Sequence, residues 1–436
     1  MRRNVASLNT LRDGDENIIR FCPIRCHVLP LSRAPSEICG LVQPSAQDRI
    51  WEEWLACPAM RTVNGLKWRP GRFDDREAIM AGFSRRNFMH LAGAGALAGT
   101  AGRGLFAEQQ YPPAVPAPAI YPYAKRATVS LVEGQERRKN VYNALLAIDD
   151  QIRPLFQAKK YVVIKPNIVE PKVPLAGTHA DALLGIMDYL APRFKGPVVI
   201  AEASARDSME GFENNHYSRV AAEFKSRQVS LVDLNREGKY EVFSIVDANI
   251  RPIPVRLAAR LLDPDAFIVC SAMLKTHNAV VATLSVKNMV IGTPLHSAPG
   301  DAQAWHDKQK YHAGPHQMNY NMAITAARLR PHWGVAVIDG YEGMEGNGPS
   351  EGTPVPSRIA LASTDFFAAD RVGLETMGIP AYAVGYLQYA SQLGLGQYDL
   401  AKIDVLGSKP ETVKRTYRLH DQVDQQLKWL RELPTA

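Results

Sequence analysis

Six polar side chains follow predicted strands, and their types suit the binding of a small polar ligand. Short apolar or β-branched runs at 161–164, 198–201, 266–270 and 334–338 are typical of buried strands. The polar residues that follow these runs are Lys165, Asn167, Glu202, Lys275, His277 and Asp339. Because ligands bind outside the carboxyl ends of strands in open parallel sheets, we expect these groups to converge on one crevice.

Three lysines would come together in this crevice, namely Lys165, Lys275 and Lys287. An uncompensated cluster of ammonium groups is costly, so it indicates either a bound anion or salt bridges to nearby carboxylates. Asn167 and Asn288 can both donate and accept hydrogen bonds, which suits a carboxylate, phosphate or sugar. The expected substrate-binding residues are Lys165, Asn167, Glu202, Lys275, Lys287, Asn288, His312 and Asn347.

A glycine-rich acidic segment, 339–349, supplies the second group of candidates. Its four glycines between 340 and 348 exclude a helix, make a poor strand and allow backbone N–H groups to approach a ligand. Carboxylates here can hold a hard cation, or move protons if burial raises a pKa. A plain surface loop is the alternative. The expected catalytic residues are His277, Asp339, Glu342 and Glu345, and a divalent metal would use Asp339, Glu345 and Asp365.

Two further aspartates flank the start of a predicted helix. Asp365 lies between a strand at 359–362 and a helix beginning near residue 368, where it is well placed as a helix cap. Asp370, on the first helical turn, either favours the helix dipole or faces the crevice.

Four histidines, at 296, 306, 312 and 316, suggest a metal site at first sight. Gly314 and Pro315 separate the last two and prevent them from sharing a helix face. We therefore expect one of these histidines to line the site, in preference to a four-histidine centre.

The order of elements predicts an α/β fold with a mostly parallel sheet flanked by helices, and with the site at the carboxyl ends of the strands. Further strands are expected at 128–132, 229–232 and 359–362, and helices at 141–156, 180–194, 217–225, 317–328, 368–377 and 383–393. The segment 421–432 is typical of a surface helix. The expected divisions are 1–79, 80–107, 108–126, 127–407 and 408–436, of which the fourth is the α/β domain and the last a helical tail.

Charge argues against a nucleic-acid partner. Of the 51 Lys and Arg and 44 Asp and Glu, residues 1–107 hold 15 and 10, which leaves 36 against 34 for residues 108–436. The larger part of the chain is therefore almost neutral, unlike a domain that binds phosphate backbones. We expect a small-molecule ligand instead.

An export signal is expected at 80–107. Arg85 and Arg86 precede Phe88 and a weakly apolar run at 91–101, a combination typical of the twin-arginine (Tat) pathway. The run is shorter than the roughly 20 residues of a membrane span. These features predict a periplasmic or otherwise extracytoplasmic protein that meets the Tat machinery and has no stable membrane span.

Export signals stand at the start of a chain, but 79 residues precede Met80 here. We interpret these residues as an extension from a start codon assigned too early. The alternative is a genuine N-terminal extension. Four of the five cysteines, at 22, 26, 39 and 57, lie in this stretch, with spacings that match no zinc or ferredoxin pattern. Between the signal and the α/β domain, 108–126 is a Pro/Ala-rich linker. Only Cys270 lies beyond the signal, which leaves no ferredoxin-type cluster motif.

From about residue 162 to residue 407 the chain resembles the domain of unknown function 362 family. The matching residues are Ile164-Lys165-Pro166-Asn167, Lys275-Thr276-His277, Lys287-Asn288-Met289-Val290-Ile291-Gly292, Lys310-Tyr311-His312, Asp339-Gly340, Met344-Glu345-Gly346-Asn347-Gly348-Pro349, Asp365 and Asp370. The resemblance implies the architecture and the region of the site, but no substrate. Many family members also carry a four-cysteine iron–sulfur segment, which this chain lacks.

Two classes of function fit these observations. The first is an exported enzyme that acts on a small anionic or hydroxylated substrate, with or without a divalent metal. The second is a binding or redox-accessory protein that holds a ligand without turnover. The family's iron–sulfur members motivate the second class, and the missing cysteines weaken it.

The export signal gives a direct prediction. Replacing both Arg85 and Arg86 by Lys should retain the precursor in the cytoplasm, because the arginine pair is the address that the receptor reads. Cell fractionation followed by immunoblotting measures this. Equal export of the parent and the double variant would contradict the assignment.

Overall fold

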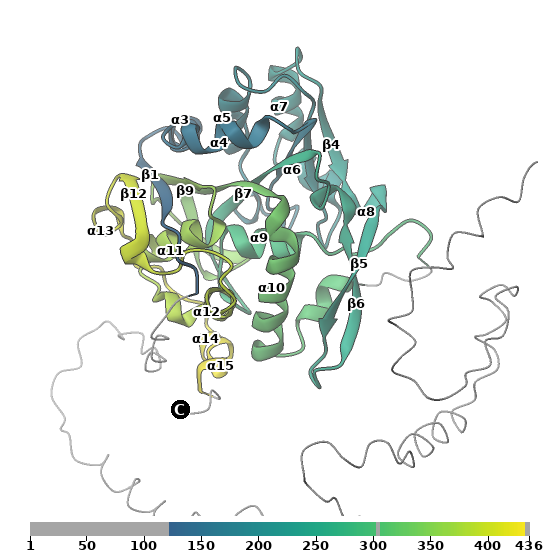
Figure 1. The fold of residues 1–436 in the computed structure, drawn as a ribbon, viewed down its shortest axis with the longest axis vertical. Helices are drawn as coiled ribbons and strands as arrows, with labels where there is room; N and C mark the ends of the chain where they lie inside the picture. The colour runs from purple at the N-terminus through teal and green to yellow at the C-terminus, as the bar shows by residue number, and fades with distance from the viewer. Residues whose placement is uncertain (1–121, 302–305, 432–436) are drawn as a thin grey trace, which may run out of the picture. The chain divides into compact units, whose positions relative to one another are not determined.

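The computed structural model describes residues 122–301 and 306–431, which build one large sheet covered by helices on both faces (Figure 1). The sheet has ten strands, in the order β12-β1-β11-β9-β7-β2-β3-β4, with β10 paired to β9 and β8 paired to β7. Its strands are β1 (Ala127–Glu133), β2 (Tyr161–Lys165), β3 (Val198–Glu202), β4 (Val229–Asp233), β7 (Ala266–His277), β8 (Val281–Thr283), β9 (Trp333–Asn347), β10 (Glu351–Val355), β11 (Ile359–Ser363) and β12 (Ile403–Gly407).

Most of the sheet is parallel. Along the eight-strand path every neighbouring pair is parallel except the two pairs made by β11. A separate antiparallel hairpin, β5 (Tyr240–Val246) and β6 (Pro252–Ala258), was not expected from the sequence. The predicted α/β fold with a mostly parallel sheet flanked by helices is confirmed.

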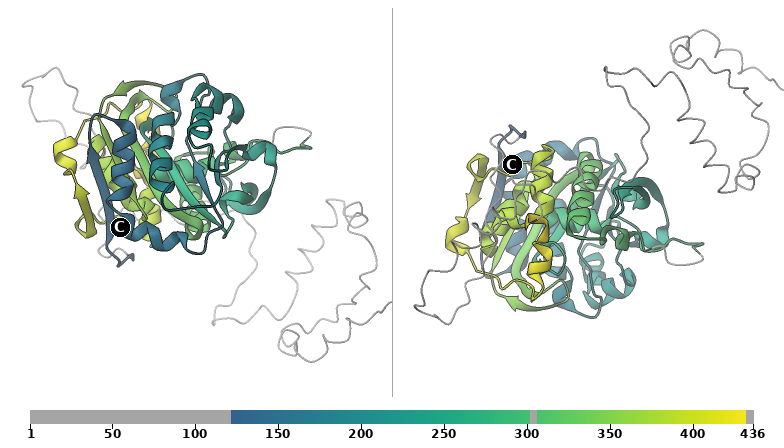
Figure 2. Two further views of the ribbon diagram at one scale, coloured as in Figure 1. Left: turned by 90° about the horizontal axis from the view of Figure 1, so that it is seen from above. Right: turned by 90° about the horizontal axis from the view of Figure 1, so that it is seen from below.

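Alternation along the buried strands creates two apolar layers. In β2, Val162 and Ile164 belong to one hydrophobic cluster and Val163 belongs to the other, because successive side chains point to opposite faces. The first layer is covered by α3 (Arg137–Leu146), α4 (Asp149–Phe156), α5 (Ala180–Leu190), α6 (Ser208–Asn214) and α7 (Tyr217–Glu223). The second is covered by α9 (Ser285–Gly292), α10 (Pro315–Leu329), α11 (Phe366–Met377) and α12 (Gly385–Gln392), as the two views of Figure 2 show.

Two central strands continue beyond their predicted ends. Lys165 and Glu202 do end β2 and β3, but β7 continues to His277 and β9 continues through Asp339 to Asn347. The extra length is paired, since β8 adds to the end of β7 and β10 adds to the end of β9. The expectation that Lys275 and Asp339 follow strands was therefore wrong.

The glycine-rich segment 339–347 is a strand, which corrects the expectation of a loop. A Cβ added at Gly343 would lie 2.0 Å from Tyr417 Oη and 2.7 Å from the Leu274 carbonyl oxygen. At Gly346 the backbone has φ of +75°, which favours glycine. These glycines permit close packing against the chain itself, so their presence does not require a ligand.

The C-terminal segment also differs from its prediction as one surface helix. It forms two short helices, α14 (Val423–Gln426) and α15 (Lys428–Arg431). Leu427 and Trp429 are buried, and the Trp429 ring lies edge-on to Tyr389 of α12, with 5.6 Å between ring centroids. The segment therefore packs onto the domain. The extension, the export signal and most of the linker lie outside the described residues.

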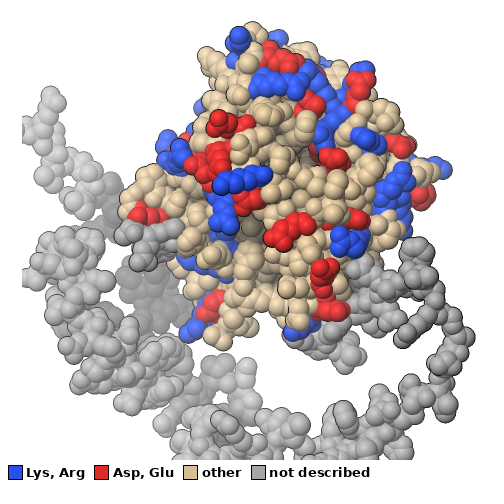
Figure 3. Space-filling model, turned by 180° about the vertical axis from the view of Figure 1, so that it is seen from behind, with Lys and Arg blue, Asp and Glu red and all other residues tan. Residues whose placement is uncertain are grey.

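Charges of both signs are interspersed on the face shown in Figure 3, where lysines and arginines lie beside aspartates and glutamates. Exposed ion pairs of the described chain include Lys160 with Asp265 and Arg236 with Asp207. In the part of the chain that the structure describes, no helix has the length and apolar character needed to cross a bilayer.

Substitution of two glycines tests this packing. Gly343→Ala should lower the free energy of unfolding by about 2 kcal/mol or more, because the new methyl group overlaps backbone and the Tyr417 hydroxyl. Gly373→Ala, within α11, is the matched control. Its Cβ would make ordinary contacts at 3.5 Å and should stabilise the helix by roughly 0.5–1 kcal/mol. Urea unfolding measures both, and equal effects would contradict the assignment of Gly343 to a packed strand.

Candidate functional site

A cavity of about 320 Å³, called the polar cavity after the charged and amide side chains that line it, lies beyond the carboxyl ends of β2, β3 and β7. Segments that follow the first two strands form one side, and α9 with the 3₁₀ helix η6 (Asp307–Tyr311) forms the other. The polar residues that line this polar cavity include Asn167, Glu202, Ser204, His277, Lys287, Asn288, Lys308 and His312. Glu202 is the only carboxylate among the lining residues, so the cavity wall carries more basic than acidic groups.

A buried ion pair lies beside the polar cavity. Lys165 Nζ is 2.9 and 3.0 Å from the two carboxylate oxygens of Glu202, and both side chains are almost fully buried. The ammonium group also donates to the carbonyl oxygen of Pro166 at 3.0 Å and to Asn288 Oδ1 at 3.1 Å. Backbone N–H groups of Ile168 and Ala203 donate to Glu202. The pair is thus saturated with partners, as a buried pair must be to persist.

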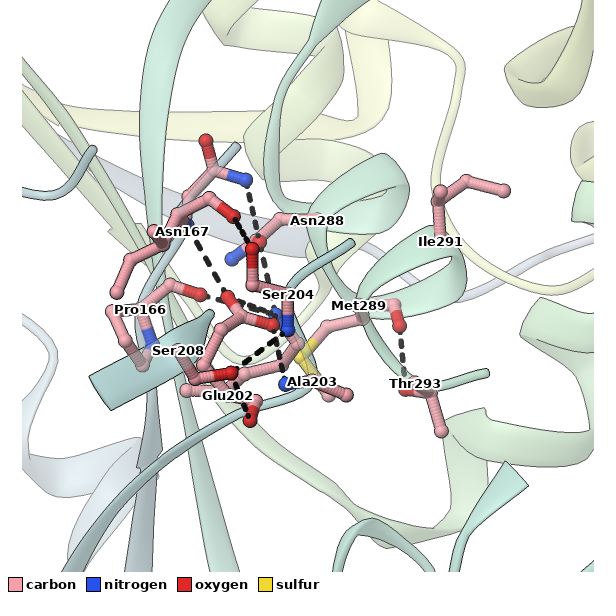
Figure 4. A network of polar contacts seen from close by, with 12 residues as sticks. Pro166, Asn167, Glu202, Ala203, Ser204, Ser208, Asn288, Met289, Ile291 and Thr293 are labelled. Atoms are coloured by element: carbon pink, nitrogen blue, oxygen red, sulfur yellow. Dashed lines mark hydrogen bonds and ion pairs between the residues drawn. The ribbon is translucent and has the colours of Figure 1, made fainter. Parts of the chain in front are cut away.

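Two asparagines extend this network, and Figure 4 shows them beside Glu202. Asn167 Nδ2 donates to Asn288 Oδ1 at 3.0 Å, and Asn288 Nδ2 donates to the sulfur of Cys270 at 3.3 Å. Asn167 Oδ1 is buried and accepts no hydrogen bond from the residues that the structure describes. Because Asn167 lines the polar cavity, this oxygen can accept a hydrogen bond from the hydroxyl of a ligand.

Lys287 is the least satisfied lysine of the site. Its side chain is buried, and no hydrogen bond or ion pair is formed by its ammonium group with any residue in 122–301 or 306–431. Burial, together with the neighbouring charge of Lys165, lowers its pKa to about 7, while Glu202 opposes the shift. Close to neutral pH, Lys287 can therefore act as a free amine or as a cation.

Two other buried lysines, Lys308 and Lys275, lie close enough to Lys287 to interact with its charge. Burial lowers the pKa of Lys308 to about 7, although its ammonium group donates to the Ile291 carbonyl oxygen at 2.6 Å. Burial also lowers the pKa of Lys275 well below its usual value, with a further contribution from Lys287. Lys275 donates to the carbonyl oxygens of Ala176 and Pro349 at 3.0 and 3.4 Å. Lys287 and Lys308 line the polar cavity, where a bound anion would supply the negative charge that they lack, whereas Lys275 is not among its lining residues.

The acidic candidates lie elsewhere. Asp339 faces the layer covered by α3, and the Arg137 guanidinium lies 3.1 Å from its carboxylate. Burial raises the pKa of Asp339 even so, while Arg137 opposes the shift. Glu342 is exposed, and Glu345 accepts a hydrogen bond from the Arg418 backbone N–H at 2.9 Å. None of the three lines the polar cavity, so the expected catalytic set is not brought together there.

Asn347 and Asp365 are likewise held by other parts of the chain. Asn347 Nδ2 donates to Asp421 at 2.8 Å, away from the lining residues. Asp365 caps α11 by accepting from the N–H groups of Phe367 and Ala368 at 3.0 and 3.1 Å. Because β11 is antiparallel to β9, the residue that follows β11 lies at the opposite end of the strands from the polar cavity. The structure does not bring Asp339, Glu345 and Asp365 together as one metal site.

Among residues 122–301 and 306–431, no group of three or more His, Cys, Asp or Glu side chains has the arrangement of a metal site. His296 and His306 do contact each other, with 3.2 Å between their Nδ1 atoms, but they do not line the polar cavity. His312 does line it.

Asp370 positions the helix that carries Lys287. Its carboxylate accepts hydrogen bonds at the start of α9 from the N–H and hydroxyl of Ser285, at 2.7 and 2.5 Å, and from the N–H of Val286 at 3.1 Å. Burial raises the pKa of Asp370 to about 7, against the effect of these hydrogen bonds. Sequence reasoning proposed two roles for Asp370 and found neither this one nor Lys308, because both depend on contacts between distant segments.

Comparison with known proteins gives three findings. A family model described as Domain of unknown function (DUF362) matches residues 162–375. The chain is 25% identical over 239 residues to the thylakoid-associated protein sll1697 of Synechocystis sp., and the match covers 54% of this chain and 68% of that protein. A crystal structure of a protein from Thermotoga maritima matches with a TM-score of 0.35 and 12% identity, over 60% of each chain. The chain thus spans less than two thirds of that protein's length.

Replacing Lys287 by Met should stabilise the fold. In the folded state its pKa is about 7, whereas in the unfolded chain it is about 10.4. The unfolded state therefore binds more protons between these values, so the cost of burying Lys287 is complete below pH 7 and disappears as the pH rises towards 10.4. We expect a gain on the order of a few kcal/mol at pH 7 that shrinks at higher pH.

Urea unfolding at several pH values between 6 and about 10 measures this gain. Lys160→Met is the control, because Lys160 is exposed and should leave the pH profile almost unchanged. A Lys287→Met variant that is less stable than the parent at every pH would show that Lys287 has a structural partner.

Asp370→Asn should loosen α9. The new amide NH₂ group can face the Val286 N–H, which places two donors together, and we expect a loss of about 1–3 kcal/mol in the free energy of unfolding. Asp365→Asn is the matched control on the same helix, because it also brings an amide NH₂ group against a backbone N–H, that of Gln397, but accepts no hydrogen bond from α9. Hydrogen exchange at residues 285–292 should accelerate only in Asp370→Asn. Unchanged exchange in both variants would contradict the positioning role.

Proposed function

Because the chain belongs to the DUF362 family, whose name states no activity, we propose from the polar cavity itself that the protein is an enzyme acting on a small hydroxylated carboxylate. The observation that carries this proposal is Lys287, a buried ammonium group that has no partner within the described residues and lines a cavity whose one carboxylate is already paired. An anion is the ligand that such a wall lacks.

The second ligand feature, a hydroxyl group, follows from Asn167. Its orphan Oδ1 atom can accept a hydrogen bond but cannot donate one, so the complementary ligand group is a donor. A small hydroxy acid carries both a carboxylate for the lysines and a hydroxyl for Asn167. The cavity volume of about 320 Å³ suits a ligand of this size.

The catalytic part of the proposal rests on acid–base groups that are poised near neutral pH. Lys287, with a pKa of about 7, can accept and return a proton in that range. Burial, together with the nearby charge of Lys287, lowers the pKa of His277 well below its usual value, so its ring is neutral. The proposal gives no role to Asp339, Glu342, Glu345 or Asp365, because none of them is among the lining residues of the polar cavity.

Ligand binding tests the proposal through a matched pair of small acids. Lactate should bind more tightly than propionate, which differs only by lacking the hydroxyl, and isothermal titration calorimetry on the full chain measures both. Binding should strengthen as the pH falls from 8 to 6, because Lys287 gains its positive charge over this range.

Lys287→Met should weaken lactate binding by about tenfold or more, whereas Lys160→Met should not. If neither acid binds, or if both bind the Lys287→Met variant as tightly as the parent, the proposed site is wrong. If lactate binds but is not converted at its hydroxyl or its carboxylate, the protein is better described as one that binds a ligand without turnover.

The location of this activity is also proposed. The arginine pair at Arg85 and Arg86 supports export by the Tat pathway, which carries folded proteins out of the cytoplasm. A substrate of this enzyme would then be a small acid of the periplasm or another extracytoplasmic compartment.

A further inference from the structure

Lys287 differs from the other lysines of the site in the availability of its nitrogen lone pair. Lys165 donates to four oxygen atoms, Lys275 to two carbonyl oxygens and Lys308 to one. Each of these donations favours the ammonium form. Within the described part of the chain, the Lys287 nitrogen has no such acceptor, so once deprotonated its lone pair faces the polar cavity.

His277 offers a hydrogen-bond donor to the same space. Its Nδ1 atom accepts a hydrogen bond from the Ala279 backbone N–H at 3.0 Å. The proton of the neutral ring must therefore be on Nε2. Because His277 lines the polar cavity, this N–H group can polarise the oxygen of a carbonyl ligand.

His312 offers the opposite property. Its Nδ1 atom lies 2.9 Å from the Lys308 carbonyl oxygen, and since a carbonyl only accepts, Nδ1 carries the proton. The Nε2 atom of the neutral ring then has a free lone pair. The structure thus gives one cavity an amine nucleophile, a neutral donor and a neutral proton acceptor.

We propose that the Lys287 amine forms an imine with the carbonyl carbon of a small 2-oxo acid bound in the polar cavity. This inference rests on the proposed function, because the same basic wall binds the carboxylate, and it assigns the imine step to those small acids that already carry an adjacent carbonyl group. The basic wall binds the carboxylate, and the carbonyl carbon is placed against Lys287.

The proposed step is balanced within the site. The Lys287 nitrogen forms a bond to the carbonyl carbon, and the π electrons move to the oxygen, which accepts a hydrogen bond from His277 Nε2–H. His312 Nε2 takes a proton from the nitrogen and returns it to that oxygen. A second such transfer releases the oxygen as water while the C=N bond forms, so amine and carbonyl give imine and water without an oxidant or reductant.

Reductive trapping tests the inference. The full chain is incubated at pH 7 with pyruvate and sodium cyanoborohydride, and adducts are mapped by peptide mass spectrometry. Lys287 should be modified at least tenfold faster than the exposed Lys139 and Lys160. Lactate should slow the reaction at Lys287 alone, because it competes for the polar cavity.

Lys287→Arg is the informative variant, since it retains a cation but cannot form an imine. It should lose the adduct and still bind lactate in calorimetry. Modification spread evenly over exposed lysines, or no adduct at Lys287, would overturn the inference even where lactate binds as the proposed function requires. If the parent chain neither binds lactate nor gives an adduct at Lys287, both proposals are wrong.

Discussion

The buried pair of Lys165 and Glu202 is the interaction on which the rest of the site depends. Ions transferred from water into a protein interior persist only with full compensation, and here the compensation comes from two strand ends, the start of the following loops and α9. Glu202 is the only carboxylate of the cavity wall, and both of its oxygens are already in use. The pair therefore fixes the geometry of the site and, within the described residues, leaves Lys287 without a counterion.

The position of α9 follows from the same constraint. At Gly292, the last residue of this helix, an added Cβ would lie 2.2 Å from Lys165 Nζ, so only glycine allows the helix end to approach the ammonium group. Asp370 holds the other end of the helix through Ser285 and Val286. Between these two attachments lie Lys287 and Asn288. One face of a short helix is thereby fixed at both ends against a rigid sheet, which is the preorganisation that a binding site needs.

Prediction from the sequence succeeded where the signal was local. Runs of β-branched residues that end in Lys165 and Glu202 indicated two strand ends, and the alternation of elements indicated the parallel sheet. It failed at Asp339, because β9 continues past this residue: Asp339 and Gly340 pair with β11, residues 343–347 pair with β10, and glycine composition does not reveal either pairing. Lys308 and the role of Asp370 depend on contacts between segments far apart in the chain, which periodicity cannot report; Ser285 and Asp370, for example, are 85 positions apart.

Burial alone does not separate the site from its scaffold. Asp339 is almost fully buried, yet the Arg137 guanidinium 3.1 Å away makes it part of the packing between α3 and the sheet. Lys287 is buried to a similar degree and lacks such a partner among the described residues. Burial of the Lys287 ammonium group therefore destabilises the folded state, and this group lines the polar cavity. A cost of this kind is consistent with function because an anionic ligand removes it, whereas a structural group would have acquired a partner from the protein itself.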